Sequence, residues 1–366
     1  MREYLFSNCA IENNNLYFFL SHSGIPAKFE LAQGQISILN FNSSLTLGKG
    51  DCIDQITAYN GRIYALRNQG DALLIYDMNI NECIDIGIDC NKKPWGNFID
   101  MFVYHSKLYI FERYKKSVLT LDCDDNKIKT RVYGFANKQE FICGSRILDR
   151  MWLFPKQGNI IGCYNLISHM YEEFSAGFEF CNVIDCTNFE NEIYILDRNG
   201  CIYCWDADDR MLSLCFSELS LELMGRIVVT NQNIILLPSV GSEIKIYDKQ
   251  IKVLRTYDQY PVGFKYEANP EWSKYHGRCE DENNIYFAMR SANHLLIIEK
   301  ESGELSWVIP QLPLSEDIAN HLISYKEDPI NEGEISLYTF MECSSPQSVK
   351  RKKSTKNGEK IWSLMK

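Results

Sequence analysis

The sequence predicts an all-β protein made of seven repeated units of antiparallel strands. One phrase recurs along the chain: a polar turn, an apolar-aromatic-apolar strand, a Gly or Asn turn, and a second strand. Its clearest copy is residues 191–206 (NEIYILDRNGCIYCWD). The apolar residue before the aromatic position recurs at intervals of 47, 45, 43, 42, 41 and 51 residues, at Leu16, Ile63, Leu108, Met151, Ile193, Ile234 and Ile285. A period of this length indicates a repeat architecture.

The predicted strands are apolar on both faces. In residues 193–196 (IYIL) no polar residue alternates with the apolar ones, as it would in a hairpin with one face in water. A sheet enclosed between two other sheets has no solvent face, so this pattern favours blades stacked around an axis. Tight hairpin turns are predicted at residues 157–158 and 199–200, because their glycines tolerate positive φ. A parallel α/β fold is a poor alternative, because helical stretches do not alternate with the strands.

With these units, the chain resembles a seven-bladed β-propeller of four-stranded antiparallel blades over about residues 3–312. The repeats resemble kelch-like or quinoprotein-like units. Trp205-Asp206 is a WD dipeptide, and residues 302–307 (SGELSW) are similar to the quinoprotein ending Thr-Gly-x-x-x-Trp. The double glycine of kelch repeats is missing from residues 66–70 (LRNQG) of the second unit. The resemblance implies that a ligand would bind near the axis of the ring.

The repeats end near residue 312, which predicts a propeller at 1–312 and a C-terminal extension at 313–366. Ser315 is a candidate N-cap, and apolar residues follow at helical spacing as far as Tyr325, so the extension is expected to be short and partly helical. Residues 345–360 form a basic linker. We expect the extension to pack against the propeller. The alternative is a segment that docks a partner or a membrane surface, because Trp and Leu follow the basic run.

Composition and charge narrow the class of protein. The 366 residues are 45% hydrophobic and carry a formal net charge of −10, which allows a large core and disfavours nucleic acid as a partner. No apolar run approaches the roughly 18 residues of a membrane span. The N-terminal residues lack the basic-then-apolar pattern of a signal peptide. We therefore expect a cytoplasmic protein whose 14 cysteines are free thiols that act as small apolar residues.

Signatures of common catalytic and metal sites are missing from the sequence. It contains no HExxH, GxSxG, Walker or GxGxxG motif. Cys201 and Cys204 form a CxxC inside a predicted strand, where positions i and i+3 point to opposite faces, which favours packing over zinc or redox chemistry. Residues 122–126 (DCDDN) begin like a calcium loop, but Lys127 stands where that loop needs glycine. No metal or cofactor is expected.

Polar residues precede the recurring apolar residue of each unit, which we call the anchor, in the strand expected to lie innermost. These strands meet at the axis of a propeller, so their polar side chains can converge from different blades. The candidate ligand-binding residues are Asp100, Arg146, Asp185, Arg226, His276 and Arg278. Arginine suits a carboxylate or phosphate, and His276 with Asp185 forms the candidate catalytic pair, as acid and base. The alternative is a water-filled channel that mutual ion pairs neutralise.

These residues and patterns are compatible with two functions. The first is a non-enzymatic scaffold that binds a protein or peptide partner, favoured by the missing catalytic motifs and the rigid multi-blade platform. The alternative is an enzyme, a lyase, isomerase or hydrolase, that acts on an anionic small molecule at the central channel. Fold alone does not decide between them.

Overall fold

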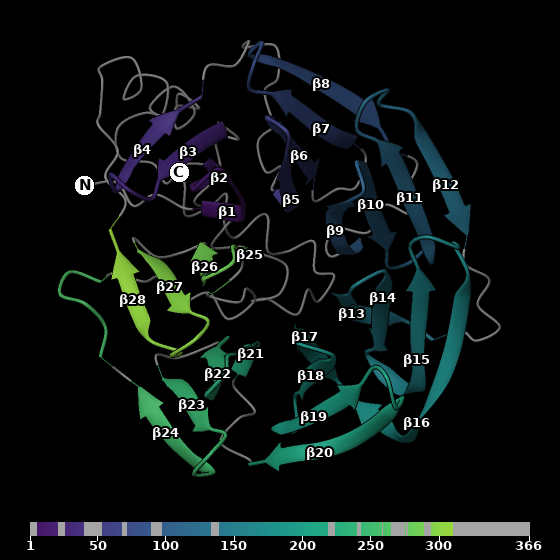
Figure 1. Ribbon diagram of the computed structural model, residues 1–366, viewed down its shortest axis with the longest axis vertical. Helices are drawn as coiled ribbons and strands as arrows, with labels where there is room; N and C mark the ends of the chain where they lie inside the picture. The colour runs from purple at the N-terminus through teal and green to yellow at the C-terminus, as the bar shows by residue number, and fades with distance from the viewer. Residues whose placement is uncertain are drawn as a thin grey trace, which may run out of the picture. The chain divides into compact units, whose positions relative to one another are not determined.

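The structure is a computed structural model that describes residues 6–20, 26–39, 53–67, 72–88, 97–132, 139–218, 224–239, 243–257, 259–264, 275, 277–288 and 294–309. Within these residues the chain forms seven four-stranded antiparallel sheets and no helix. The sheets are blades arranged around a ring (Figure 1). The predicted seven-bladed β-propeller is confirmed. His276 and the C-terminal extension, with its basic linker, lie outside the described residues.

Each blade is built from four consecutive strands, and the first of them lies innermost (Figure 1). Blades 1 to 4 contain β1 (Phe6–Glu12), β2 (Asn15–Leu20), β3 (Pro26–Glu30), β4 (Gln35–Ile38); β5 (Ile53–Tyr59), β6 (Arg62–Arg67), β7 (Ala72–Asp77), β8 (Glu82–Gly87); β9 (Phe98–Tyr104), β10 (Lys107–Glu112), β11 (Ser117–Asp122), β12 (Ile128–Val132); β13 (Phe141–Ile147), β14 (Arg150–Pro155), β15 (Gln157–Asn165) and β16 (Tyr171–Cys181). Blades 5 to 7 contain β17 (Val183–Phe189), β18 (Glu192–Asp197), β19 (Cys201–Asp206), β20 (Met211–Ser217); β21 (Met224–Val229), β22 (Asn233–Pro238), β23 (Ile244–Asp248), β24 (Val253–Tyr257); β25 (Gly277–Glu280), β26 (Asn284–Ala288), β27 (Leu295–Glu299) and β28 (Leu305–Val308).

The seven sequence anchors occupy the same place in every blade. Each is the second residue of the second strand, and each is buried. The second strand has a strand on either side within its blade and a neighbouring blade against each face, so both faces of the strand are apolar. This is why the repeat is readable in the sequence.

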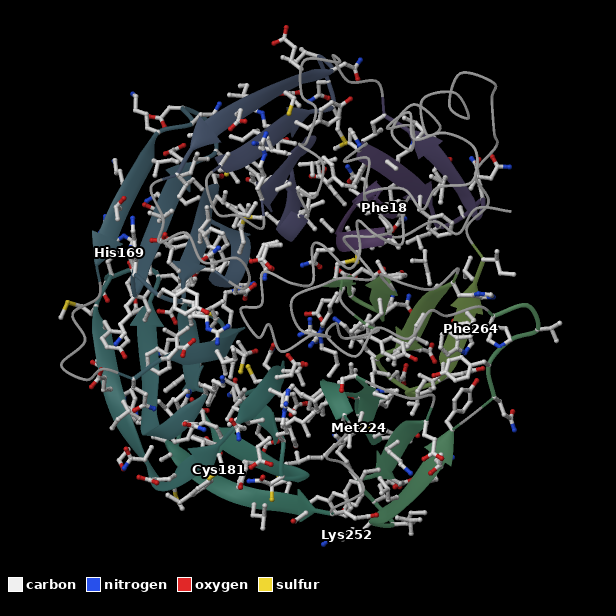
Figure 2. All side chains as sticks on the ribbon, turned by 180° about the vertical axis from the view of Figure 1, so that it is seen from behind. Phe18, His169, Cys181, Met224, Lys252 and Phe264 are labelled. Carbon is white, nitrogen blue, oxygen red and sulfur yellow. The ribbon has the colours of Figure 1, made fainter. Side chains whose placement is uncertain are left out.

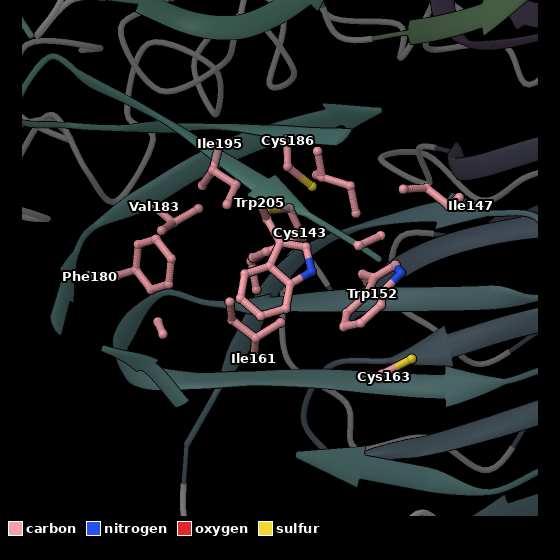
Figure 3. Packing of buried hydrophobic residues seen from close by; sticks show 14 residues of the cluster. Cys143, Ile147, Trp152, Ile161, Cys163, Phe180, Val183, Cys186, Ile195 and Trp205 are labelled. Atoms are coloured by element: carbon pink, nitrogen blue, oxygen red, sulfur yellow. The ribbon is translucent and has the colours of Figure 1, made fainter. Parts of the chain in front are cut away.

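The core lies between the blades, as the packing of blade 4 on blade 5 shows (Figure 3). Trp152 and Trp205 meet edge to face there, with ring centroids 5.5 Å apart, a favoured geometry for aromatic pairs. Cys163 lies in the same cluster, and burial raises the pKa of its thiol to about 12. The described cysteines are all free, and many of them fill the core as small apolar groups, as the sequence indicates.

Two turns of each blade lie on one face of the ring, which we call the short-turn face: the turn between the first and second strands, and the turn between the third and fourth. In six blades a backbone N–H of the second turn donates to a carbonyl of the first at 2.7–3.1 Å. These bonds join Met78 to Gly61, Cys123 to Ser106, Leu166 to Asp149, Ala207 to Asn191, Lys249 to Gln232 and Lys300 to Asn283. The face is therefore regular from blade to blade.

Within the residues described above, each blade is made of consecutive strands, so the ring closes between the innermost strands β1 and β25. Asn8 on β1 links three blades: its Oδ1 accepts from Arg278 N at 3.2 Å, and its Nδ2 donates to Asp54 O at 2.9 Å. Side-chain hydrogen bonds at the centre thus join the first and last blades, which in this ring share no strand.

The direction from the centre to the rim can be followed in Figure 2. Met224, on innermost β21, lies toward the centre, whereas Lys252 lies at the rim.

Candidate functional site

An ion pair joins blades 5 and 6 at the centre of the ring. Asp185 lies on β17 and is buried, and its Oδ1 is 3.2 Å from Arg226 Nη1 on β21. The other carboxylate oxygen, Oδ2, accepts a hydrogen bond from the backbone N–H of Ile227 at 3.0 Å. That N–H lies on the innermost strand, which has no inner neighbour in its sheet, so the carboxylate supplies the missing acceptor.

Arg226 also reaches the next blade. Its Nε donates to the backbone carbonyl of Tyr275 at 3.1 Å, just before β25. One guanidinium group therefore joins blade 5, through Asp185, to blade 7, through Tyr275. Arginine suits this role because its donors are fixed in a planar fork.

Arg278 makes a longer connection. It projects from β25, and its Nη2 donates to Thr187 Oγ1 on β17 at 2.8 Å, so it links blade 7 to blade 5 past the intervening blade 6. A second, weaker interaction joins Nη2 to Glu280 Oε2 at 3.5 Å. The two arginines that the sequence proposes as ligand-binding residues thus both have partners within the ring.

Asp100 on β9 differs from the other channel residues. Its Oδ1 accepts a hydrogen bond from its neighbour Met101 N at 2.8 Å. Burial raises the pKa of the Asp100 carboxyl to about 6, and the charges of Arg146 and Arg278 oppose this shift only in part. Desolvation disfavours the charged carboxylate, so this group exchanges its proton much closer to neutral pH than an ordinary aspartate does.

Arg146 lies apart from the Asp185–Arg226 pair, at the junction of blades 3 and 4. Its guanidinium carbon is 5.3 Å from the ring centroids of both Phe102 and Tyr104. Its Nη1 donates to the backbone carbonyl of Leu148 at 3.3 Å, in the turn after β13. Stacking on two aromatic rings holds the cation near the short-turn face.

The structure therefore brings some of the proposed residues together and separates others. Asp185 and Arg226 form a pair, and Arg278 is bound two residues further along β17 at Thr187. The charges of Arg146 and Arg278 both act on Asp100, although neither forms an ion pair with it in the described structure. His276 lies outside the described residues, so its proposed acid–base pairing with Asp185 stays a prediction.

Three partners at the centre do not stand out in the sequence: Thr187, Tyr275 and Glu280. Tyr275 contributes a backbone carbonyl, which no side-chain pattern reveals. Thr187 lies two residues after Asp185 on the same strand, and this spacing was the one available signal. In the described part of the chain, no group of three or more His, Cys, Asp or Glu side chains is arranged to hold a metal ion. No helix within the same residues is long and apolar enough to cross a membrane.

Comparison with known proteins places the fold. No family model matches the chain, and no curated protein matches its sequence. The chain is similar in structure to virginiamycin B lyase from Staphylococcus aureus, with a TM-score of 0.58, 14% identity, and coverage of 78% of this chain and 92% of that one. A streptogramin B lyase structure matches with a TM-score of 0.60 and 12% identity, over 84% of this chain and 95% of that one. The structure of YCF48 bound to D1 peptide matches with a TM-score of 0.59 and 7% identity, over 81% of this chain and 91% of that one. Identities this low establish the propeller fold alone.

Proposed function

We propose that this chain is a non-catalytic β-propeller that binds a protein or a peptide. One observation carries the proposal: the arginines at the centre are engaged with partners inside the ring. Arg226 is bonded to Asp185 and to the Tyr275 carbonyl, and Arg278 is bonded to Thr187. An arginine that serves an anionic substrate must turn donors toward it, whereas here Nε and Nη1 of Arg226 and Nη2 of Arg278 are directed at groups of the ring itself.

The same bonds favour a rigid platform. They connect blades 5, 6 and 7, while Asn8 connects blades 7, 1 and 2. A rigid surface loses little entropy when it binds, so it can present side chains to a flexible partner at low cost. The structural neighbour that is bound to a peptide, YCF48, supports this use of the fold by analogy.

A calorimetric comparison tests the proposal. A panel of small carboxylates and phosphates is titrated into the wild type, into Arg226→Gln and into Arg278→Gln, and peptides selected from a random library are titrated into the same three proteins. We expect no heat with the anions, and peptide affinities that the two substitutions leave within twofold. Micromolar binding of an anion to the wild type, lost in Arg278→Gln, would instead support an anion site at the channel.

A second candidate is an enzyme that acts on an anionic small molecule at the channel, and Asp100 is the observation that favours it. A carboxyl group with a pKa of about 6 is suited to proton transfer near neutral pH, and two arginine charges lie close to it. In this candidate Asp100 replaces Asp185 as the acid or base, because the Asp185 carboxylate is held by Arg226 and Ile227. Turnover lost in Asp100→Asn, with a melting temperature that is the same or higher, is the result expected of such an enzyme.

The cellular compartment and the repeat class are also part of the proposal. We propose a cytoplasmic protein with kelch-like or quinoprotein-like repeats, on the sequence patterns given above. A fluorescent fusion checks the compartment, and titration of the thiols in denaturant without reductant checks its redox state. Nearly all 14 cysteines should react.

A further inference from the structure

Blade 4 exposes three apolar side chains on the short-turn face. Leu148 is 77% exposed, Ile167 65% and Met170 62%. Leu148 lies in the turn between β13 and β14, and the other two lie in or beside the turn between β15 and β16. We call these three residues the blade 4 patch.

The two turns that carry the patch are fastened to each other. Leu166 N donates to Asp149 O at 2.7 Å, and Asn165 Nδ2 donates to Asp149 Oδ2 at 2.9 Å. Tyr109 of blade 3 also donates from its hydroxyl to Leu166 O at 3.0 Å. The backbone that presents the apolar side chains is therefore fixed on two sides, and the patch needs little ordering when a partner arrives.

The other blades provide an internal comparison for Leu148. The same turn position holds Asn60 in blade 2, His105 in blade 3 and Glu190 in blade 5, all with positive φ. Leu148 has φ 52° and is the one apolar side chain among the described non-glycine residues with positive φ. Leucine is poorly suited to the left-handed region, whereas asparagine tolerates it. Blade 4 thus keeps an unfavourable residue at an exposed site, as functional positions do.

Other blades also have a polar residue at the position that Ile167 occupies in blade 4. The third residue of the turn between the third and fourth strands is Asn79 in blade 2, Asp124 in blade 3, Asp208 in blade 5 and Gln250 in blade 6. These turns begin with an Asp or Asn whose side chain accepts from this residue's backbone N–H, at 2.9–3.0 Å. The backbone geometry is shared, so isoleucine is not a requirement of the turn.

Cationic side chains border the patch, beside the Asp149 carboxylate that Asn165 holds at 2.9 Å, although the chain as a whole carries −10. Burial lowers the pKa of His169, in the patch's own turn, and the positive charges of Arg131 and Lys107 from blade 3 lower it further. His169 lies toward the outer rim of the ring (Figure 2). On the inner side, Arg146 donates to the carbonyl of Leu148 itself. An apolar centre with a charged border is the anatomy of an interaction site.

We propose that the blade 4 patch docks a short peptide segment whose apolar side chains cover Leu148, Ile167 and Met170 and whose flanking Asp or Glu residues face Arg131, Lys107 and Arg146. This inference rests on the proposed function and assigns it a place and a partner chemistry. A second copy of this chain is a poorer occupant, because a symmetric dimer would set the same cations against each other.

A peptide selection tests the inference. Random 12-residue peptides displayed on phage are selected on the immobilised full-length protein, and the enriched sequences are synthesised for fluorescence anisotropy. The test variants take their residues from other blades: Ile167→Asp, as in blades 3 and 5, and Leu148→Asn, as in blade 2. We expect each to weaken binding at least tenfold, while Leu148→Asn melts at the same or a higher temperature because asparagine suits its φ.

Blade 6 provides a matched control. Ile251 is 68% exposed in the corresponding turn between β23 and β24, so Ile251→Asp makes the same chemical change away from the patch. It should leave peptide affinity within twofold. Arg131→Glu and Lys107→Glu should each weaken peptide binding several-fold at low salt. Peptides whose Asp and Glu are replaced by Asn and Gln should bind these two variants as tightly as they bind the wild type.

The outcomes separate the inference from the function on which it rests. Selected peptides that bind Ile167→Asp as tightly as the wild type would leave peptide binding in place and overturn the blade 4 patch as its site. Enriched peptides without acidic residues would overturn the partner chemistry. A dimer in sedimentation velocity that Ile167→Asp abolishes would reassign the patch to self-association. Failure to enrich any peptide would count against the proposed function as well.

Discussion

Replacing Asp185 by asparagine tests whether the central ion pair joins the blades. The substitution keeps the shape of the side chain and removes its charge. Asparagine can still accept from Ile227 N through its single oxygen, but its amide then faces Arg226 with donors against donors. The pair is largely enclosed, with side-chain exposures of 10% for Asp185 and 27% for Arg226.

The exposures set the expected magnitude. Breaking a fully buried ion pair costs about 3–5 kcal/mol, and breaking an exposed one about 0–1 kcal/mol. Because Arg226 retains some contact with water, we expect a loss of about 2–3 kcal/mol. A domain of about 300 residues unfolds with an entropy near 0.6 kcal/mol/K, so the melting temperature should fall by about 3–5 °C.

Circular dichroism melting at pH 7 measures the change. Asp248→Asn is the matched control, because blade 4 has Asn165 at the equivalent turn position, and it should melt within about 1 °C of the wild type. Combining Asp185→Asn with Arg226→Gln should recover part of the loss, since no unpaired charge is then left at the centre. An Asp185→Asn protein that melts like the wild type would refute the bridging role and return Arg226 to the candidates for anion binding.

Three further predictions concern the centre of the ring and the joints between its blades. The pKa of Asp100 is raised from 3.8 to about 6 on folding, so its ionisation lowers stability as pH rises through this window; Asp100→Asn should add about 1–3 kcal/mol at pH 7 and flatten the stability curve between pH 4 and 6. Gly144→Ala should cost about 1–3 kcal/mol in urea unfolding, because its Cβ would stand 2.8 Å from the Trp152 carbonyl oxygen. The sulfurs of Cys9 and Cys279 are 3.3 Å apart between the first and last blades, so exchange with one oxidised glutathione should form a disulfide and release two reduced glutathiones. Mass spectrometry of non-reduced peptides should find this cross-link in the wild type and not in Cys279→Ser.

The architecture could be predicted from the amino-acid sequence. The anchors from Leu16 to Ile285 recur because each second strand is enclosed by the same neighbours, so the packing requirement repeats with the chain. Turns are set by residues close in sequence, and the Asp or Asn that opens the turn before the fourth strand in blades 2 to 6 was visible for this reason. The burial of the cysteines followed from the same local patterns.

The contacts at the centre, by contrast, depend on how the blades pack around the ring. Asp185 and Arg226 were both candidates, but whether they bind a ligand or each other could not be read from either strand. A register shift between Val183 and Asp185 changes which way the later side chains of the strand point. Arg278 meets Thr187 across 91 positions of the chain. A repeat encodes what each blade shares, whereas the centre and the blade 4 patch depend on how the blades differ, and those differences acquire meaning only when the ring brings them together.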